Sequence, residues 1–175
     1  KKSSNFKISP SKGVNLLISK QKLPLEETIV VPSPEDPKRL FFMIPWFENS
    51  VVLGTTDSSY QGSLEHIPIL EQEIEYILKT CNQFFNQLNL TKADIIGEFA
   101  GVRPLVSHVN QSTQNLSRDY VLQWESENYL RIFGGKLTGF KAMAEACFNE
   151  ISKQSHQKFK VVAKIDFLFN LNESL

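Results

Sequence analysis

Two apolar runs separated by a short polar break constrain the fold of this chain more than any other feature. Residues 39–47 read RLFFMIPWF and residues 50–56 read SVVLGTT, with Glu48-Asn49 between them. Runs rich in β-branched and aromatic residues favour strands, and the polar break favours a hairpin. Aliphatic runs at 15–20 and 27–32 extend the pattern to an antiparallel meander. Pro45 has no backbone N–H, which predicts that its strand lies at a sheet edge or bulges there.

A helix is predicted over residues 70–88, because apolar side chains recur there at steps of three and four residues. They are Leu70, Ile74, Ile77, Leu78, Cys81, Phe84, Phe85 and Leu88. Glutamates at 71, 73 and 75 lie toward the amino end, where the helix dipole favours negative charge. We expect this helix to cover a core and to carry no chemistry.

The second half of the sequence predicts more strands and one more helix. Residues 94–106 favour a strand that runs into a turn, residues 107–115 a polar loop, and residues 120–124 and 129–133 a strand pair. Gly134-Gly135 then leads into a helix for which Thr138 is the expected N-cap. Its apolar face consists of Phe140, Met143, Ala144, Cys147 and Ile151. The predicted fold class is α+β, an antiparallel sheet with flanking helices.

Charge and composition leave few special classes open. Nineteen basic and nineteen acidic residues cancel, so nothing global favours nucleic acid or an anionic membrane. No apolar run approaches the ~20 residues that a membrane-spanning helix needs. Cys81 and Cys147 are expected to be reduced thiols, and no metal site is expected. The histidines are predicted to lie on the surface; they are His66, His108 and His156.

Three cations stand beside residues that shape the backbone. Arg103 lies in Ala-Gly-Val-Arg-Pro-Leu, Arg118 at a junction of loop and strand, and Lys136 directly after two glycines and before a helix. Such groups grip phosphate or carboxylate, and a helix amino terminus adds backbone N–H donors. Structural salt bridges to Asp57, Glu98 or Asp119 are the alternative. We expect one anionic site.

A second polar cluster closes the strand at 50–56. Gly54-Thr55-Thr56-Asp57 is either a strand end with turn chemistry or the floor of a pocket. No GxGxxG and no Walker motif occurs, so no segment of this sequence predicts a pyrophosphate cradle of the usual kind.

The order of these motifs resembles the FAD-dependent glycerol-3-phosphate dehydrogenases of the D-amino-acid-oxidase-like flavoprotein superfamily. The resemblance covers residues 11–152 and rests on six motifs: Ser11–Leu16, Ile44–Trp46, Gly54–Asp57, Ala100–Leu105, Ser117–Tyr120 and Phe133–Thr138. It implies that residues 11–105 are part of a substrate-binding cap and residues 106–152 the last part of the FAD domain. Residues 1–10 are then a leader or a fragment boundary, and residues 153–175 the start of a truncated segment.

The resemblance also implies roles for individual residues. Arg103, Arg118, Lys136 and Thr56 are similar to residues that hold glycerol 3-phosphate. Asn15 stands where the family commonly has the His that accepts the substrate's hydroxyl proton, and an amide cannot take that proton near neutral pH. The cofactor-binding residues that the resemblance implies are Gly134, Gly135, Lys136, Leu137 and Thr138.

For the parent protein the resemblance implies oxidation of sn-glycerol 3-phosphate to dihydroxyacetone phosphate, with FAD as cofactor and a quinone as acceptor. It further implies a cytoplasmic enzyme held peripherally at the inner membrane, with no nucleic-acid partner, and it allows a homodimer. The fragment itself is expected to be inactive because the dinucleotide-binding segment is missing. The alternatives are a glycerol-3-phosphate oxidase that uses oxygen and a non-catalytic anion-binding module.

Overall fold

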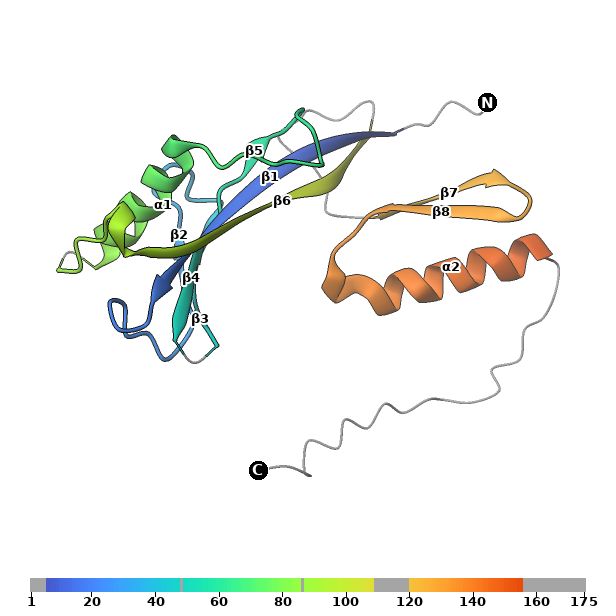
Figure 1. The fold of residues 1–175 in the computed structure, drawn as a ribbon. Coiled ribbons are helices and arrows are strands. Elements are labelled where there is room, and N and C mark those ends of the chain that lie inside the picture. Colours follow the sequence, from blue (N-terminus) through green and yellow to red (C-terminus); the bar gives the residue numbers. More distant parts are fainter. Residues whose placement is uncertain (1–5, 48, 86, 109–119, 156–175) are drawn as a thin grey trace, which may run out of the picture. The chain divides into compact units, whose positions relative to one another are not determined.

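The structure is a computed structural model that describes residues 6–47, 49–85, 87–108 and 120–155. The chain divides into two compact units, Lys1–Asp119 and Tyr120–Leu175 (Figure 1). Each unit is described by itself.

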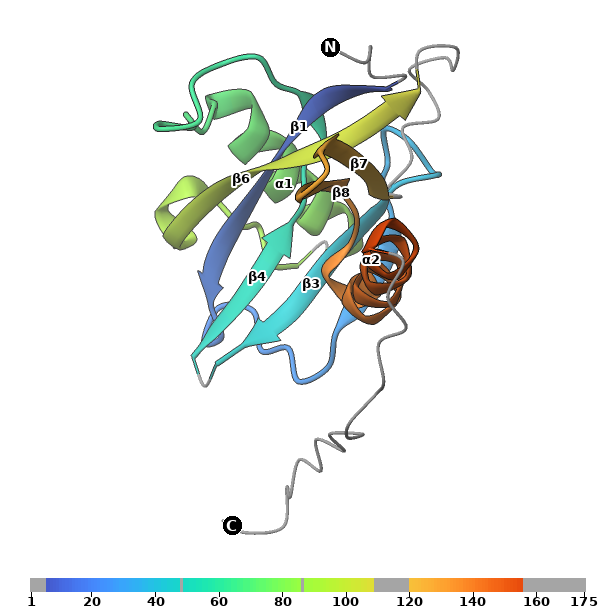
Figure 2. The same ribbon diagram turned by 90° about the vertical axis from the view of Figure 1, so that its right-hand side faces the viewer.

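The first unit is built on a six-stranded antiparallel sheet in the order β2-β3-β4-β1-β5, with β6 pairing along β1 (Figures 1 and 2). Its strands are β1 (Phe6–Ser19), β2 (Ile29–Pro32), β3 (Leu40–Trp46), β4 (Ser50–Gly54), β5 (Ser58–Ser59) and β6 (Ile95–His108). The long ladder between β1 and β6 joins segments about ninety residues apart, from Phe6 opposite His108 to Ile18 opposite Ile95. The predicted antiparallel sheet is confirmed, and so is the β3–β4 hairpin, of which Glu48 lies outside the described residues.

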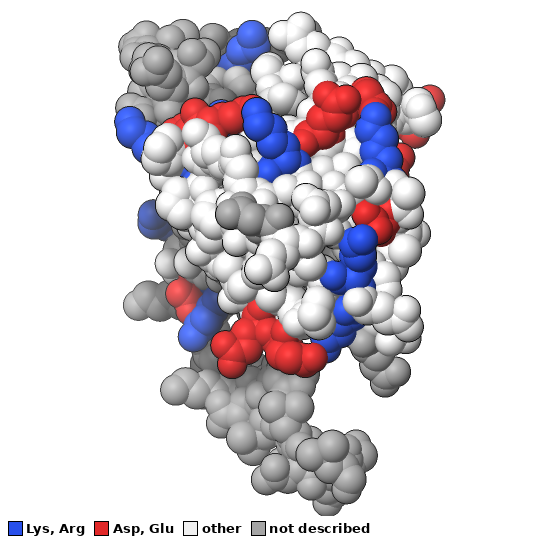
Figure 3. All heavy atoms as spheres, turned by 90° about the vertical axis from the view of Figure 1, so that its left-hand side faces the viewer, with Lys and Arg blue, Asp and Glu red and all other residues white. Residues whose placement is uncertain are grey.

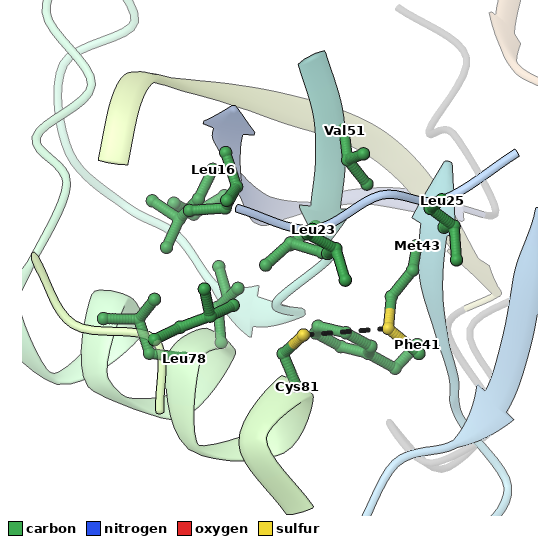
Figure 4. Close-up of a cluster of buried hydrophobic side chains, with 13 residues drawn as sticks. Leu16, Leu23, Leu25, Phe41, Met43, Val51, Leu78 and Cys81 are labelled. Atoms are coloured by element: carbon green, nitrogen blue, oxygen red, sulfur yellow. Dashed lines mark hydrogen bonds between the residues drawn. The ribbon is translucent and has the colours of Figure 1, made fainter. Parts of the chain in front are cut away.

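One face of this sheet packs on helix α1 (Glu71–Phe84), which the short helix η1 (Lys92–Asp94) follows. Side chains alternate along a strand, so Val14, Leu16 and Ile18 of β1 point to the same face, where all three are fully buried. Figure 4 shows the cluster: Phe41 and Met43 of β3 meet Cys81 of α1, whose Sγ lies 3.8 Å from the Met43 sulfur. The predicted core helix is therefore confirmed.

Three expectations about these strands need correction. Phe6–Pro10, expected to be part of a leader or fragment boundary, belong to β1 and pair with β6. β3 is an inner strand, but Pro45 lies beyond the residues that pair with β2, so no neighbour on that side requires its missing N–H. The strand predicted over residues 94–106 does not run into a turn at its end but continues as β6 to His108. β6 also crosses the boundary predicted at residues 105 and 106.

The second unit contains a hairpin and a helix. Its elements are β7 (Tyr120–Ser126), β8 (Tyr129–Gly134), the short helix η3 (Leu137–Gly139) and α2 (Phe140–Ser155). The predicted strand pair and helix are confirmed. Thr138 is not the N-cap, because it lies within η3. The N-cap of η3 is Lys136, and η3 is followed directly by α2. The tail beyond Ser155 and most of the predicted polar loop lie outside the described residues.

The surface charges, the two cysteines and one histidine can be compared with what the sequence predicted. Acidic and basic side chains are interspersed on the face that Figure 3 shows, and Lys22, for example, lies 3.3 Å from Asp94. Cys81 and Cys147 are free thiols, and His66 is exposed. Within the described residues no cluster of metal-binding side chains occurs, and none of the helices there is long and apolar enough to cross a membrane.

Candidate functional site

Arg103 is held across the face of the sheet that α1 does not cover. Its Cα lies opposite Ser11 in the β1–β6 ladder, and Gly101 lies opposite Gly13. A Cβ atom on Gly13 would lie 2.7 Å from Nη1 of Arg103 and 2.7 Å from Oγ1 of Thr55. The guanidinium therefore occupies the space that a side chain at residue 13 would take, and only glycine allows this position.

Two polar groups after β4 fix the direction of the guanidinium. Arg103 Nη2 donates a hydrogen bond of 3.2 Å to Thr55 Oγ1, and Nη1 lies 4.0 Å from a carboxylate oxygen of Asp57. The Ser11 hydroxyl donates to that same carboxylate oxygen. The carboxylate therefore attracts the guanidinium at a distance too long for a hydrogen bond, and Thr55 sets its orientation.

The guanidinium still has hydrogen-bonding capacity to spare. Nη1 is buried and has no hydrogen-bond acceptor among the described residues. The side chain as a whole is one-third exposed, at 33%. Arginine carries five N–H donors in a planar fork, and Arg103 donates one hydrogen bond to the described residues, from Nη2 to Thr55. The exposed part of the fork, rather than the buried Nη1, can therefore bind an oxyanion.

Asn15 lies on the same open face. It is opposite Phe99 on β6 and opposite Gly54 on β4. A Cβ on Gly54 would come within 3.0 Å of Asn15 Cγ, so the carboxamide rests on the glycine backbone. No hydrogen bond of this carboxamide is formed within the described residues, which leaves both its donor and its acceptor available to a ligand.

Thr56, expected to contact substrate, faces the protein interior. It is 7% exposed. Its Oγ1 accepts a hydrogen bond of 2.9 Å from the Val14 amide, and its own amide donates to the Val14 carbonyl at 3.3 Å. These bonds continue the pairing of β1 where β4 ends. Thr55, not Thr56, contacts Arg103. Both threonines and Asp57 line a pocket of about 570 Å³. A pocket floor was one of the two interpretations of this segment.

A buried ion pair supports the wall of that pocket. Lys12 Nζ lies 2.7 Å from Glu73 Oε2 and donates to the Pro68 carbonyl at 3.0 Å. The two side chains are 4% and 9% exposed. The same glutamate oxygen accepts from the Leu70 amide at 2.9 Å, so one carboxylate both caps α1 and anchors the helix to β1 next to Gly13.

The second unit supplies the glycine-paired turn. Gly134 and Gly135 have φ angles of 73° and 88°, in the left-handed region that favours glycine. A Cβ on Gly135 would also lie 3.3 Å from Met143 Cε and 3.4 Å from Tyr120 Cβ. The turn delivers the chain to η3, with Lys136 exposed before the free N–H groups at the helix start.

The structure brings only part of the predicted anionic site together. Asn15 and Arg103 share one face of the first unit, whereas Lys136 belongs to the second unit. Arg118 lies outside the described residues. The convergence of the three cations therefore stays a prediction.

Two residues beside Arg103 were missed as members of the site. Gly13 and Thr55 appear in the quoted motifs, but neither was assigned to the guanidinium. Asp57 was named as a partner of the arginines in the salt-bridge alternative, and it lies 4.0 Å from Arg103 Nη1. The signal that could have found Gly13 is the spacing of small and polar residues in Ser11–Asn15, where every second residue faces the same side of a strand.

Comparison with known proteins supplies the family. The model of the family described as "FAD dependent oxidoreductase" matches residues 1–146, most of the chain. This chain belongs to the FAD-dependent oxidoreductase family. The match spans the sheet that carries Arg103 and Asn15 and also the glycine turn at 134–135.

Relatives within the family carry a more specific name. The aerobic glycerol-3-phosphate dehydrogenase of Escherichia coli (strain K12) is 38% identical over 119 residues, which is 66% of this chain and 24% of the relative. The enzyme of that name from Bacillus subtilis (strain 168) is 33% identical over 77% of this chain and 24% of its own. The oxidoreductase chain thus spans about a quarter of the length of these relatives.

A solved structure agrees with the fold. The glycerol-3-phosphate dehydrogenase from Bacillus halodurans, in complex with FAD, aligns with a TM-score of 0.74 at 27% identity. The alignment covers 90% of this chain and 29% of the other. The resemblance inferred from the motifs is confirmed at the level of family, fold and family cofactor.

The residues predicted to hold FAD fit an approaching flavin edge. The Gly134-Gly135 turn has no side chains that would block an approach to its backbone N–H groups. Leu137 is 88% exposed and Phe140 66% exposed at the start of the helix. Small residues beside exposed apolar ones are the surroundings that a planar, largely apolar ring with polar edges needs.

Proposed function

We propose that this chain is part of a flavoenzyme that oxidises sn-glycerol 3-phosphate to dihydroxyacetone phosphate, with a quinone as electron acceptor. The observation that carries the proposal is the partly exposed Arg103 guanidinium, which is seated on Gly13 and oriented by Thr55 on the sheet face that α1 does not cover. A fixed arginine fork suits a phosphoryl group, and the relatives bear the name of this activity.

In the proposed reaction the residues of this chain bind and orient the substrate. Arg103 holds the phosphoryl group, with Arg118 and Lys136 as further cations. FAD, when bound, supplies the chemistry that accepts a hydride from the alcohol carbon. Backbone N–H groups after Gly135 and the amino end of the helix would face the flavin edge where negative charge develops.

The hydroxyl proton needs a separate acceptor. The Asn15 carboxamide can hydrogen-bond to the substrate oxygen but cannot take its proton near neutral pH. Asn15→His should therefore speed flavin reduction, by up to about 10²–10⁴-fold if the imidazole acts as a full general base. The gain should appear as the pH rises through about 6.5, since only neutral imidazole accepts a proton. If Asn15→His and the unchanged protein reduced the flavin at the same rate at every pH, another group would be the base.

The direct test is anaerobic addition of glycerol 3-phosphate to the full-length protein reconstituted with FAD. We expect the flavin absorbance to bleach, and Arg103→Ala to raise the half-saturating substrate concentration by about 10–150-fold, because a charged hydrogen bond contributes about 1.5–3 kcal/mol. Lys20→Ala is the matched control: it also removes one positive charge, but from the exposed pair of Lys20 with Glu26 at the other end of β1.

Two outcomes separate this proposal from its rivals. Substrate binding without bleaching would favour a non-catalytic anion-binding module, for which Asn15 is the specific observation. Bleached flavin that transfers electrons to oxygen with a stoichiometric yield of peroxide, and not to a quinone, would favour an oxidase.

Three finer proposals follow for the chain and its parent. The 175-residue chain alone should neither retain FAD nor turn over. Stoichiometric FAD binding by the purified chain in equilibrium dialysis would refute this. The parent is proposed to be a cytoplasmic protein attached peripherally to the inner membrane and to form a homodimer. Membrane flotation and sedimentation velocity of the parent test these two points.

A further inference from the structure

We propose that Gly101 determines ligand specificity: the open space over it receives the carbon chain of a small phosphorylated alcohol whose phosphoryl group Arg103 holds. The inference rests on the proposed function for the identity of that ligand. In this inference Gly101 makes no bond to the ligand; the absence of a side chain at residue 101 provides the space that the ligand's carbon chain occupies.

The first step is the order of cross-strand pairs on the open face. Ser11 lies opposite Arg103, Gly13 opposite Gly101, and Asn15 opposite Phe99. Residues two apart on a strand share a face, so these three pairs form consecutive rows across β1 and β6. The middle row has no side chains at all. It is a gap between a cationic row and a row that carries an amide and an aromatic ring.

The second step is that the two glycines of the gap are not equivalent. The space over Gly13 is filled, because Arg103 Nη1 and Thr55 Oγ1 would each lie 2.7 Å from a Cβ there. A Cβ on Gly101 would meet nothing within 4 Å. The open space therefore lies over Gly101 of β6, while the guanidinium occupies the space over its partner Gly13.

The third step is size. Residues 99 and 103 are about 13 Å apart along an extended strand, at about 3.3 Å per residue. That length accommodates a phosphoryl group at the arginine end and a chain of a few carbons reaching the Asn15–Phe99 row. The half-exposed Phe99 ring, at 47%, offers apolar contact to carbon, and the unbonded Asn15 carboxamide offers hydrogen bonds to a hydroxyl.

The test compares two ligands that differ only in whether they extend over Gly101. Dissociation constants for glycerol 3-phosphate and for inorganic phosphate are measured by calorimetry on the full-length protein with FAD. Gly101→Ala should weaken glycerol 3-phosphate at least tenfold and change phosphate by less than twofold. Arg103→Ala should weaken both ligands. Glu98→Ala is the control and should change neither dissociation constant. Glu98 is exposed on the same strand, and its partner across the ladder is the core residue Leu16.

Equal losses for the two ligands in Gly101→Ala, or no loss for either, would overturn the inference. Gly101→Ser serves as a second variant and should give a larger ratio than Gly101→Ala. Failure of both variants to fold would contradict the open space itself. Because binding is measured apart from turnover, the outcomes stay distinct: the predicted ratio without flavin reduction refutes only the proposed oxidation, and flavin reduction without the ratio refutes only the role of Gly101.

Discussion

The two units use the same kinds of sequence pattern but differ in what they bury. In the first unit Leu16, Phe41 and Ile77 have no exposed surface, and α1 covers one face of the sheet (Figure 4). No residue of the second unit is buried within 120–155, the part of it that is described, and Phe140 on α2 is 66% exposed. Periodicity thus predicts where a helix forms, but among the residues described only those of the first unit bury the apolar stripe of their helix in a core.

The largest expected effect tests this difference with two phenylalanines. Phe41→Ala should lower the free energy of unfolding by about 3–5 kcal/mol, because it leaves a cavity in a closed core. Phe140→Ala should change it by less than about 0.5 kcal/mol, because its ring is mostly in solvent. Denaturant unfolding measures both, with Trp46 reporting on the first unit in a Trp124→Phe background and Trp124 on the second in a Trp46→Phe background. Similar losses would remove the distinction between the units.

A smaller effect is expected at the buried ion pair. Lys12→Met leaves the Glu73 carboxylate buried without its cation and should cost about 3 kcal/mol, the low end for breaking a buried pair, since the Leu70 amide still donates to Glu73. The exposed pair of Lys153 with Glu150 on α2 is the control, and Lys153→Met should leave stability nearly unchanged. A Lys12→Met protein as stable as the unchanged one would show that apolar packing, not this ion pair with its hydrogen bonds, holds α1 to β1.

The smallest effect concerns the two cysteines. Burial raises the pKa of the Cys81 thiol to about 12, whereas Cys147 is half-buried. A thiol reagent at pH 8 should label Cys147 and leave Cys81 unlabelled until the protein unfolds, because the thiolate is the reactive form. The unfolded thiol ionises near pH 9.0 and the folded one near 12, so the stability that Cys81 contributes is complete below pH 9.0 and is lost as the pH rises toward 12. Equal labelling of both thiols would indicate an open first unit.

Element types followed from the sequence, but pairing did not. Alternation and three-to-four spacing predicted β3, β4, α1, β7, β8 and α2. The strand at Phe6–Pro10 was not predicted because its partner strand is about ninety residues away, and local composition does not show that pairing. For the same reason the strand predicted over residues 94–106 was expected to run into a turn, whereas pairing with β1 keeps it extended to His108.

The candidate site was predictable where a single residue carries the signal. Arg103 and the Gly134-Gly135 turn could be identified from their neighbours in sequence. The hydrogen bond of Arg103 to Thr55 and the inward position of Thr56 depend on how β1, β4 and β6 align, which sequence spacing alone does not determine.

The measurement that tests the account most directly is a crystal structure of the full-length protein with FAD and glycerol 3-phosphate. The account predicts that phosphoryl oxygens lie about 2.7–2.9 Å from guanidinium nitrogens of Arg103, with Arg118 and Lys136 on the same anion and the carbon chain over Gly101. A ligand bound away from Arg103, or three cations that point to separate anions, would contradict it.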